Sequence, residues 1–351
     1  MRENNFDAIR LLAAATVIFG HAHPLTQTPD TALLGNSVQA MAVKIFFVIS
    51  GYLICTSWSL DTNPVRYLKK RALRIFPALF VICVLTIFVA GPLTTSLPLS
   101  QYFSYLHTFG YFRNVLLYPI YDLPGVFTDN AYPIAVNGSL WSLPIEFAMY
   151  LVLPFVMLLS RALGSKSLVV IITLSFCIFS LKFVRIDPPI THPVFYGSDL
   201  ISMLDVAPYF MIGAVVSACQ LERLLDPVVA LFLAFLVALF PPSSASVSEL
   251  VLFVLLPYCT LSLAMSYQRV LAKAGRFGDF SYGLYLYGFL VQQTVNHFTH
   301  NALSALQNAL VSLPIALVLA VLSWYYVEKP MLALKPRSRM DNLKVSLEEI
   351  K

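Results

Sequence analysis

Residues 38–60 read VQAMAVKIFFVISGYLICTSWSL, a run in which Lys44 is the only charged side chain. A helix that crosses the hydrocarbon core of a bilayer needs about 20 largely apolar residues, so this run predicts a membrane span. Stretches of the same kind lie on both sides of it, at residues 6–25, 72–92, 140–159, 167–185, 200–219, 227–241, 248–267, 281–299 and 303–326. The sequence therefore predicts an all-α fold, a polytopic transmembrane bundle of about ten helices.

The composition excludes an ordinary soluble protein. Hydrophobic residues make up 58% of the 351 residues and charged residues only 12%, whereas soluble domains carry about 25% charged residues. The net charge of +5 would suit nucleic acid, but the basic residues lie in short loops and the tail, without the basic and aromatic face of a nucleic-acid module. Five cysteines without a CxxC pair predict neither a disulfide framework nor a metal site.

The distribution of basic residues predicts the topology, because cytoplasmic loops of membrane proteins are rich in Lys and Arg. With the N-terminus inside, the outer side receives only Lys44, Arg113, Lys182 and Arg185. The cytoplasmic side receives the tail cations together with Arg66, Lys69, Lys70, Arg71, Arg74, Arg161, Lys166, Arg223, Arg269, Lys273 and Arg276. A further span at residues 100–121 would reverse every later loop, so we predict a re-entrant or interfacial element there. Both termini are then cytoplasmic.

The chain divides into one membrane domain, residues 1–334, and a charged cytoplasmic tail, residues 335–351. Asp7 and Arg10 interrupt the first apolar run, so we interpret residues 6–25 as a retained helix, not as a signal peptide. Residues 93–139 and 186–199 form the longer outer connections. We detect no internal repeat, which gives no support to inverted-repeat transporter architectures.

The first predicted helix carries two ionisable side chains, Arg10 and His21. Such groups are expensive inside a membrane and are therefore candidates for function. Their spacing corresponds to about three helical turns, so both project from one face, about 16 Å apart along the axis. The alternative is that Arg10 anchors the helix at the inner interface and His21 lies at the outer interface.

Two further motifs carry charge near the ends of predicted spans. Arg71 and Arg74 share one face of a helix and are suited to gripping phosphate, although an ordinary basic flank is the alternative. In Ser139-Leu-Trp-Ser-Leu-Pro-Ile-Glu146 we expect Ser142 to cap a helix and Glu146 to point into the bundle, where it would meet His21. The alternative for that motif is simple capping. The small Ser50-Gly51 step indicates close helix packing.

The order of these motifs resembles the membrane acyltransferase-3 family, whose members O-acylate carbohydrates at the cell envelope. The resemblance extends from about Phe6 to Pro330 and is carried by Arg10 and His21, FFVISGYL at 46–53, RALR at 71–74, SLWSLPIE at 139–146, SYGLYL at 281–286 and YVEKP at 326–330. Many relatives place a histidine shortly after the SYGLYL motif, where this chain reads Tyr287-Gly288. A direct catalytic role for that region is therefore not expected here.

The resemblance implies a membrane-bound O-acyltransferase of the cytoplasmic membrane that uses acetyl-CoA, or another acyl-CoA such as succinyl-CoA, and no metal. Its acceptor would be a carbohydrate, such as polysaccharide or lipopolysaccharide, and its assembly partners a homo-oligomer or an envelope-biosynthesis protein. The residues carried over are His21 and Glu146 for catalysis, Arg10, Arg71 and Arg74 for the donor, and Trp141, Ser142, Tyr282 and Tyr285 for substrate binding.

Two mechanisms and two other functions stay open at this point. His21 would remove a proton from the acceptor hydroxyl as it attacks the thioester, or would itself take the acyl group and pass it on. A many-helix bundle with buried charges also describes a transporter or flippase for an envelope glycan or small solute. A non-catalytic assembly partner in envelope-polymer synthesis is the third function.

Overall fold

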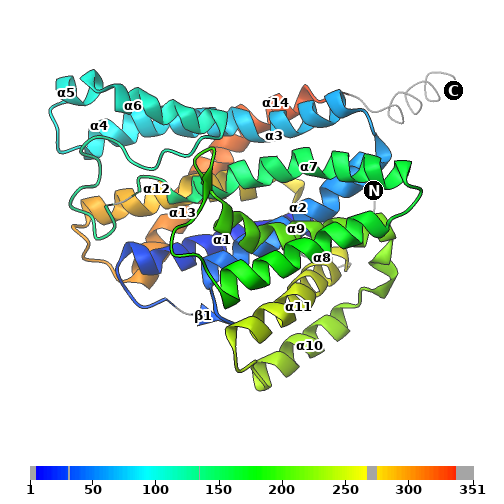
Figure 1. Cartoon of the computed structure of the whole chain (residues 1–351). Helices are drawn as coiled ribbons and strands as arrows, with labels where there is room; N and C mark the ends of the chain where they lie inside the picture. The colour runs from blue at the N-terminus through cyan, green and yellow to red at the C-terminus, as the bar shows by residue number, and fades with distance from the viewer. Residues whose placement is uncertain (1–4, 31, 134, 267–274, 337–351) are drawn as a thin grey trace.

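This computed structural model describes residues 5–30, 32–133, 135–266 and 275–336. The predicted tail beyond residue 336 and the loop cations Arg269 and Lys273 lie outside the described residues. The described chain is almost entirely helical, and its long helices lie side by side in one bundle (Figure 1). Helices α3 and α14 run along one edge of this bundle, and α10 lies at the opposite edge.

The long helices are α1 (Phe6–Leu25), α2 (Val38–Leu60), α3 (Pro64–Leu85), α7 (Ser142–Ala162), α8 (Ser167–Ser180), α9 (Leu200–Cys219), α10 (Pro227–Leu239), α11 (Ala245–Met265), α12 (Ser281–Phe298) and α13 (Ala305–Ser323). Three of them continue into π-helical segments, which are η1 (Thr86–Ala90), η4 (Leu181–Ile186) and η7 (Trp324–Glu328). The shorter pieces are α4 (Gly91–Thr94), α5 (Leu99–Ser104), α6 (Leu106–Gly110), η2 (Tyr111–Leu116), η3 (Gly138–Trp141), η5 (Leu221–Leu224) and α14 (Lys329–Ala333).

Each of the ten predicted spans overlaps one of these long helices, but only eight helices of the described chain are long and apolar enough to cross a membrane. Helix α10 has 13 residues, about 20 Å, which is short for a hydrocarbon core of about 30 Å. Helix α12 carries Gln292, Gln293 and Asn296, which reduce its apolar character. The protein is thus a polytopic helical membrane bundle, and the crossing number of ten stays a prediction. Residues 100–121 hold only short helices, so they do not form a continuous further span.

Two small β-hairpins interrupt the all-α pattern. Strand β1 (Ala32–Leu33) pairs antiparallel with β2 (Asn36–Ser37), and β3 (Val194–Phe195) pairs in the same way with β4 (Ser198–Asp199). Gly35 and Gly197 occupy the turns with positive φ, together with the residue before each. Two consecutive residues with positive φ are typical of the tight turns that join paired strands. Each hairpin leads directly into a helix, β2 into α2 and β4 into α9.

Helices α2 and α9 pack backbone to backbone, as the Ser50-Gly51 step predicted. A Cβ atom added to Gly51 would lie 1.8 Å from the carbonyl oxygen of Phe210, and one added to Gly213 would lie 2.2 Å from the carbonyl oxygen of Val48. The same sequence offset relates Gly51 to Gly213, Val48 to Phe210 and the two turn glycines. The contact is therefore reciprocal, and the hairpin and helix occur twice, a local repeat that the sequence analysis did not detect.

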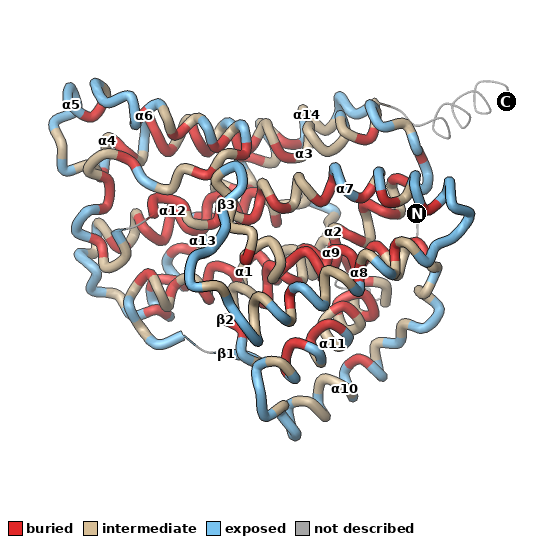
Figure 2. The backbone as a smooth tube through the Cα atoms, viewed as in Figure 1, coloured by how far each residue is buried: buried red, intermediate tan, exposed pale blue. Residues whose placement is uncertain are grey.

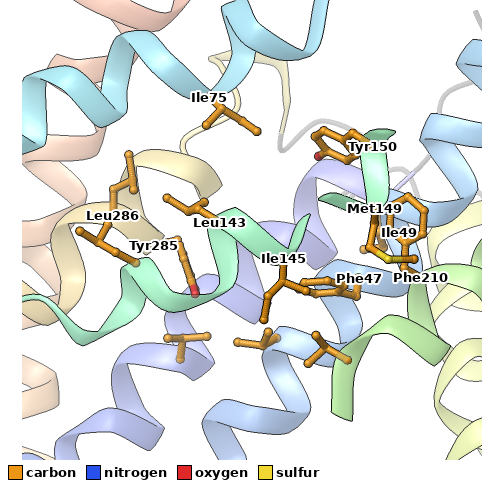
Figure 3. Close-up of a cluster of buried hydrophobic side chains, with 14 of the residues drawn as sticks. Phe47, Ile49, Ile75, Leu143, Ile145, Met149, Tyr150, Phe210, Tyr285 and Leu286 are labelled. Atoms are coloured by element: carbon orange, nitrogen blue, oxygen red, sulfur yellow. The ribbon is translucent and has the colours of Figure 1, made fainter. Parts of the chain in front are cut away.

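The buried residues concentrate in the middle of the bundle, on α1, α2, α9 and α12, whereas α10 is mostly exposed (Figure 2). Ala230 is the one buried residue of α10. A close-up of the main apolar cluster shows side chains from α2, α3, α7, α9 and α12 meeting, among them Phe47, Ile75, Leu143 and Phe210 (Figure 3). Leu, Val and Phe side chains exposed on outer helices such as α8 and α10 face the lipid, since a bilayer is the solvent for this surface.

Candidate functional site

A cavity of about 300 Å3 opens between α1, α2, α3, α7 and the start of α12. Its polar lining comes from segments far apart in the sequence: Arg10, Ser50, Arg71, Arg74, Ser142, Glu146, Tyr150, Asp279, Ser281, Tyr282, Tyr285 and Lys335. Apolar walls are supplied by α2 and α3, with Phe46, Phe47 and Ile75 among them. Seven of the nine site residues predicted from the sequence thus share one cavity. His21 and Trp141 are the two that do not line it.

Four cations gather at one part of this cavity, and we call Arg10, Arg71, Arg74 and Lys335 the basic mouth. Arg71 and Arg74 lie one turn apart on α3, as their spacing predicted. The Nε atoms of Arg10 and Arg71 are buried without a hydrogen-bond partner. Unpaired buried donors of this kind are costly unless a ligand satisfies them. The basic mouth is therefore suited to an anionic ligand.

The charges of the basic mouth shift the pKa values of two groups outside the spans, Asp279 and Lys335. Burial alone would raise the pKa of Asp279, but Arg74 and Arg10 and hydrogen bonds from Ser281 outweigh it, so this pKa lies well below its usual range. Burial, assisted by repulsion from Arg71 and Arg74, lowers the pKa of Lys335 to about 8. An anion bound here would relieve that repulsion and favour the protonated lysine.

Glu146 lies in the first turns of α7 and points into the bundle, as predicted, but it does not meet His21. Its Oε1 atom accepts hydrogen bonds from the Ser50 hydroxyl, at 2.6 Å, and from the Tyr150 hydroxyl. Among the described residues no hydrogen bond or ion pair joins Glu146 to His21. Ser50, expected only to allow helix packing, therefore also helps to fix a carboxylate in the cavity.

The predicted substrate-binding residues are anchored to the walls. Tyr285 shares a 2.6 Å hydrogen bond with Ser142 and donates to the Ser139 carbonyl, while Tyr282 donates to the Ile75 carbonyl. The prediction that Ser142 caps a helix is wrong, because Ser142 is the first residue of α7 and its hydroxyl is held by Tyr285. A 3-10 helix precedes it, capped by the Asn137 side chain. Trp141 packs against the apolar core instead of lining the cavity.

His21 lies near the end of α1 opposite to Arg10, outside the cavity lining. Its ring packs edge-on against Phe289, with the ring centres 5.1 Å apart. Nδ1 is buried without a hydrogen-bond partner among the described residues, whereas the residue as a whole is only partly buried. Phe289 follows the cavity residue Tyr285 by one turn of α12, about 6 Å. His21 thus contacts a residue that lies one turn beyond the cavity wall on α12.

The structure adds residues that the sequence analysis did not assign to the site. Asp279 binds Arg10 and Arg74, Glu328 approaches Arg74, and Tyr150 binds Glu146. Glu328 lies within the YVEKP stretch, and Asp279 lies two residues before the SYGLYL stretch. Both residues are therefore in or next to motifs that the sequence analysis recognised. Their charge near a predicted span was the available signal.

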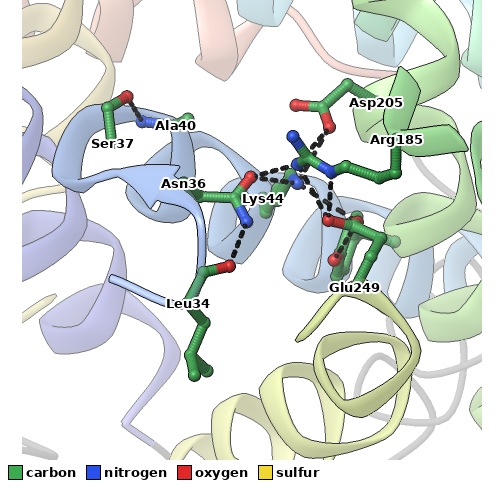
Figure 4. A network of polar contacts seen from close by, with 9 residues as sticks. Leu34, Asn36, Ser37, Ala40, Lys44, Arg185, Asp205 and Glu249 are labelled. Carbon is green, nitrogen blue, oxygen red and sulfur yellow. Dashed lines mark hydrogen bonds and ion pairs between the residues drawn. The ribbon is translucent and has the colours of Figure 1, made fainter. Parts of the chain in front are cut away.

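A second buried polar cluster lies apart from the cavity (Figure 4). The Lys44 amine contacts Asn36, Asp205 and Glu249, at 2.7, 3.0 and 3.3 Å, and Arg185 binds the same three residues. Lys44 and Glu249 are fully buried. The topology analysis counted Lys44 on the outer side, within the predicted span 38–60. It lies inside α2, where carboxylates on α9 and α11 neutralise its charge.

Comparisons with known proteins support the family resemblance that the order of the motifs indicated. Residues 3–329 match the family model described as an acyltransferase domain. An O-acetyl transferase of Shigella phage Sf6 is 30% identical over 341 residues, which are 94% of this chain and 96% of that protein. Nodulation protein 10 of Rhizobium leguminosarum bv. viciae is 33% identical over 163 residues, 44% of each chain. No solved structure matches the chain.

Proposed function

Because the chain belongs to the acyltransferase-3 family of multi-pass membrane O-acyltransferases, we propose that it transfers an acyl group from acyl-CoA to a carbohydrate hydroxyl. Acetyl is the proposed group, since a relative similar along almost the whole chain is named an O-acetyl transferase. The carbohydrate would be a lipid-linked or cell-surface glycan, such as polysaccharide or lipopolysaccharide. The membrane would be the cytoplasmic one, where CoA is available on the inner side.

The observation that carries this proposal is the cavity that joins a basic mouth to a set of fixed hydroxyl and carboxylate groups. CoA carries phosphates at one end and its thioester at the other. Arg10, Arg71, Arg74 and Lys335 would hold the phosphates, because guanidinium forks match phosphate geometry and lysine adds a point charge. The pantetheine arm would then follow the apolar walls toward Ser142 and Tyr285. The excess of basic residues in loops on this side supports a cytoplasmic position for the mouth.

His21 is the proposed general base. The acceptor oxygen would bond to the thioester carbon while the C–S bond breaks, His21 Nε2 would take the hydroxyl proton, and the CoA thiolate would leave and recover a proton. Such proton transfer contributes about 100- to 10,000-fold to rate. Since Glu146 binds Ser50 and Tyr150, its proposed role moves from stabilising the imidazole to shaping the donor end of the cavity. The thioester end of the donor would have to reach beyond the cavity lining to meet His21, which packs against Phe289.

The proposal is tested with purified protein in vesicles. Radiolabelled acetyl-CoA is added on the side of the membrane that the basic mouth faces, together with glycan from the host envelope. Label should appear on the glycan, with mass spectrometry showing one added acetyl group per modified sugar, and a His21→Ala protein should give none. Movement of a solute across the vesicle without labelled glycan would instead support a transporter or flippase. Unchanged envelope glycan in cells that lack the protein would contradict the proposal.

A further inference from the structure

One carboxylate, Asp279, binds two of the three arginines of the basic mouth. Its Oδ2 atom lies 2.9 Å from Nη2 of Arg10 and 2.6 Å from Nη2 of Arg74. Arg10 belongs to α1 and Arg74 to α3, so this one side chain links two helices that are distant in sequence. Asp279 also lines the cavity itself.

The Asp279 side chain is held in one orientation by the start of α12. Its Oδ1 atom accepts hydrogen bonds from the Ser281 hydroxyl, at 2.5 Å, and from the Ser281 backbone N–H, at 3.3 Å. Its side chain is 13% exposed, so solvent contributes little to that orientation. A carboxylate fixed in this way fixes the direction of any guanidinium group that binds it.

The three arginines differ in how their charge is used. Arg10 pairs with Asp7 and Asp279, and Arg74 pairs with Asp279 and lies 3.6 Å from Glu328. Arg71 forms no ion pair with any carboxylate in the described part of the chain. Its buried Nε has no partner, although the side chain lines the same cavity. Within the described residues, the Arg71 guanidinium is thus available for a ligand.

We infer that Asp279 is a positioning residue of the donor site: it orients Arg10 and Arg74 beside the donor's phosphates, and it leaves Arg71, which it does not bind, as the arginine that supplies the largest share of the hydrogen bonds to those phosphates. This inference rests on the proposed function. Without the charge of Asp279, the mouth becomes more positive, so an anionic donor binds at least as tightly. The guanidinium groups of Arg10 and Arg74 lose their common anchor, however, and the donor is displaced. Displacement of reacting atoms by about 1 Å costs about 100-fold in rate.

The test compares Asp279→Asn, Arg71→Gln and the control Asp187→Asn, which changes an exposed carboxylate remote from the cavity lining. Binding of desulfo-CoA is measured by calorimetry, and kcat and donor KM by acyl transfer. Asp279→Asn should lower kcat roughly ten-fold or more with no weakening of desulfo-CoA binding. Arg71→Gln should weaken binding and raise donor KM by roughly ten-fold or more. The control should match the wild-type protein.

A double-mutant cycle adds a readout that a purely structural role would not change. Adding Arg74→Gln to Asp279→Asn should lower kcat by less than the product of the single effects, because the two side chains act through one contact. Adding Arg71→Gln to Asp279→Asn should multiply the two effects. Asp279→Glu, which keeps the charge, should restore part of the turnover lost in Asp279→Asn.

Three results would overturn the inference: desulfo-CoA binding weakened by Asp279→Asn as strongly as by Arg71→Gln, coupling of Asp279 to Arg71 as large as to Arg74, or no recovery with glutamate. A wild-type protein that binds desulfo-CoA and transfers acyl groups while giving those results leaves the proposed function intact. A wild-type protein that neither binds desulfo-CoA nor transfers an acyl group overturns the proposed function itself.

Discussion

The two ring nitrogens of His21 lie in different surroundings. Nδ1 is buried without a hydrogen-bond partner among the described residues, and the ring packs against Phe289, so Nε2 is the nitrogen proposed to take the proton. The proposed base therefore receives no carboxylate assistance from Glu146, which is committed to Ser50 and Tyr150. At this scale, the proposed chemistry depends on the position and access of a single imidazole.

The first prediction concerns His21→Ala. Removing the general base should lower kcat for acyl transfer by about 100- to 10,000-fold. Desulfo-CoA binding should be unchanged, because His21 does not line the cavity. Steady-state transfer kinetics and calorimetry measure the two quantities, with the melting temperature as a control for folding. Wild-type turnover in this variant would contradict the role assigned to His21.

The second prediction concerns pH and Lys335. Because its pKa in the free protein is about 8, the Lys335 amine is mostly protonated below pH 8 and loses its proton above that pH. A bound anion favours the protonated form, so binding should take up a proton between about pH 8 and 10, and affinity should fall as pH rises through that window. Titration with desulfo-CoA, which has no thiol to ionise, measures this. In Lys335→Gln the decline should disappear, and an unchanged decline would exclude Lys335 as its source.

The residues that sequence reasoning placed correctly obey local rules. Arg71 and Arg74 follow from helical spacing, and the inward direction of Glu146 follows from the cost of a carboxylate in lipid. Asp279 does not follow from such rules, because its partners Arg10 and Arg74 lie on helices that only the tertiary fold brings together. The expected pairing of Glu146 with His21 was wrong for a different reason, since Tyr150, one turn away on the same helix, and Ser50 on α2 bind Glu146 instead.

At the scale of elements, the contact between α2 and α9 gives the third prediction. In Gly51→Ala the new methyl group would lie 1.8 Å from the Phe210 carbonyl oxygen, so the helices must separate. Overpacking of this kind costs about 1–3 kcal/mol, and the melting temperature in detergent should fall. The matched control is Gly110→Ala, at which nothing lies within 4 Å of the added atom. Equal melting temperatures for the two variants would contradict this packing.

The buried ionic cluster joins α2, η4, α9 and α11 and gives the fourth prediction. Lys44→Met leaves the Asp205 and Glu249 carboxylates with Arg185 alone, and an uncompensated buried charge costs about 3–5 kcal/mol. The melting temperature should therefore fall more in Lys44→Met than in Lys44→Met combined with Glu249→Gln, which restores neutrality. A double variant less stable than the single variant would show that hydrogen bonding, not charge, dominates the cluster.

At the scale of the whole molecule, the fold class was predictable because apolar runs of about 20 residues have few alternatives in a membrane. The crossing number is harder to predict, since α10 is short and α12 is shielded by other helices. The hairpins before α2 and α9 were missed because two strand residues leave no periodic pattern.

The fifth prediction tests the topology of ten crossings. In a variant free of the native cysteines, Ser243→Cys after α10 and Ala302→Cys after α12 should react with an impermeant maleimide from outside intact cells. Ser165→Cys, between α7 and α8, should react only after the membrane is permeabilised. All three positions are exposed in loops. Protection of Ser243→Cys in intact cells would show that α10 does not cross, and protection of Ala302→Cys would show the same for α12.

The reciprocal backbone contact between α2 and α9, at Gly51 and Gly213, bears on how these two helices can move against each other. Neither glycine has room for a Cβ atom, so α2 and α9 are in close backbone contact at two points, one related to the other by the repeat. Carriers that expose a site alternately to two compartments need halves that rock or shear past each other. The two close contacts leave α2 and α9 little room to shear past each other, which agrees with the proposed role of an acyltransferase whose helices stay in place while the acyl group passes.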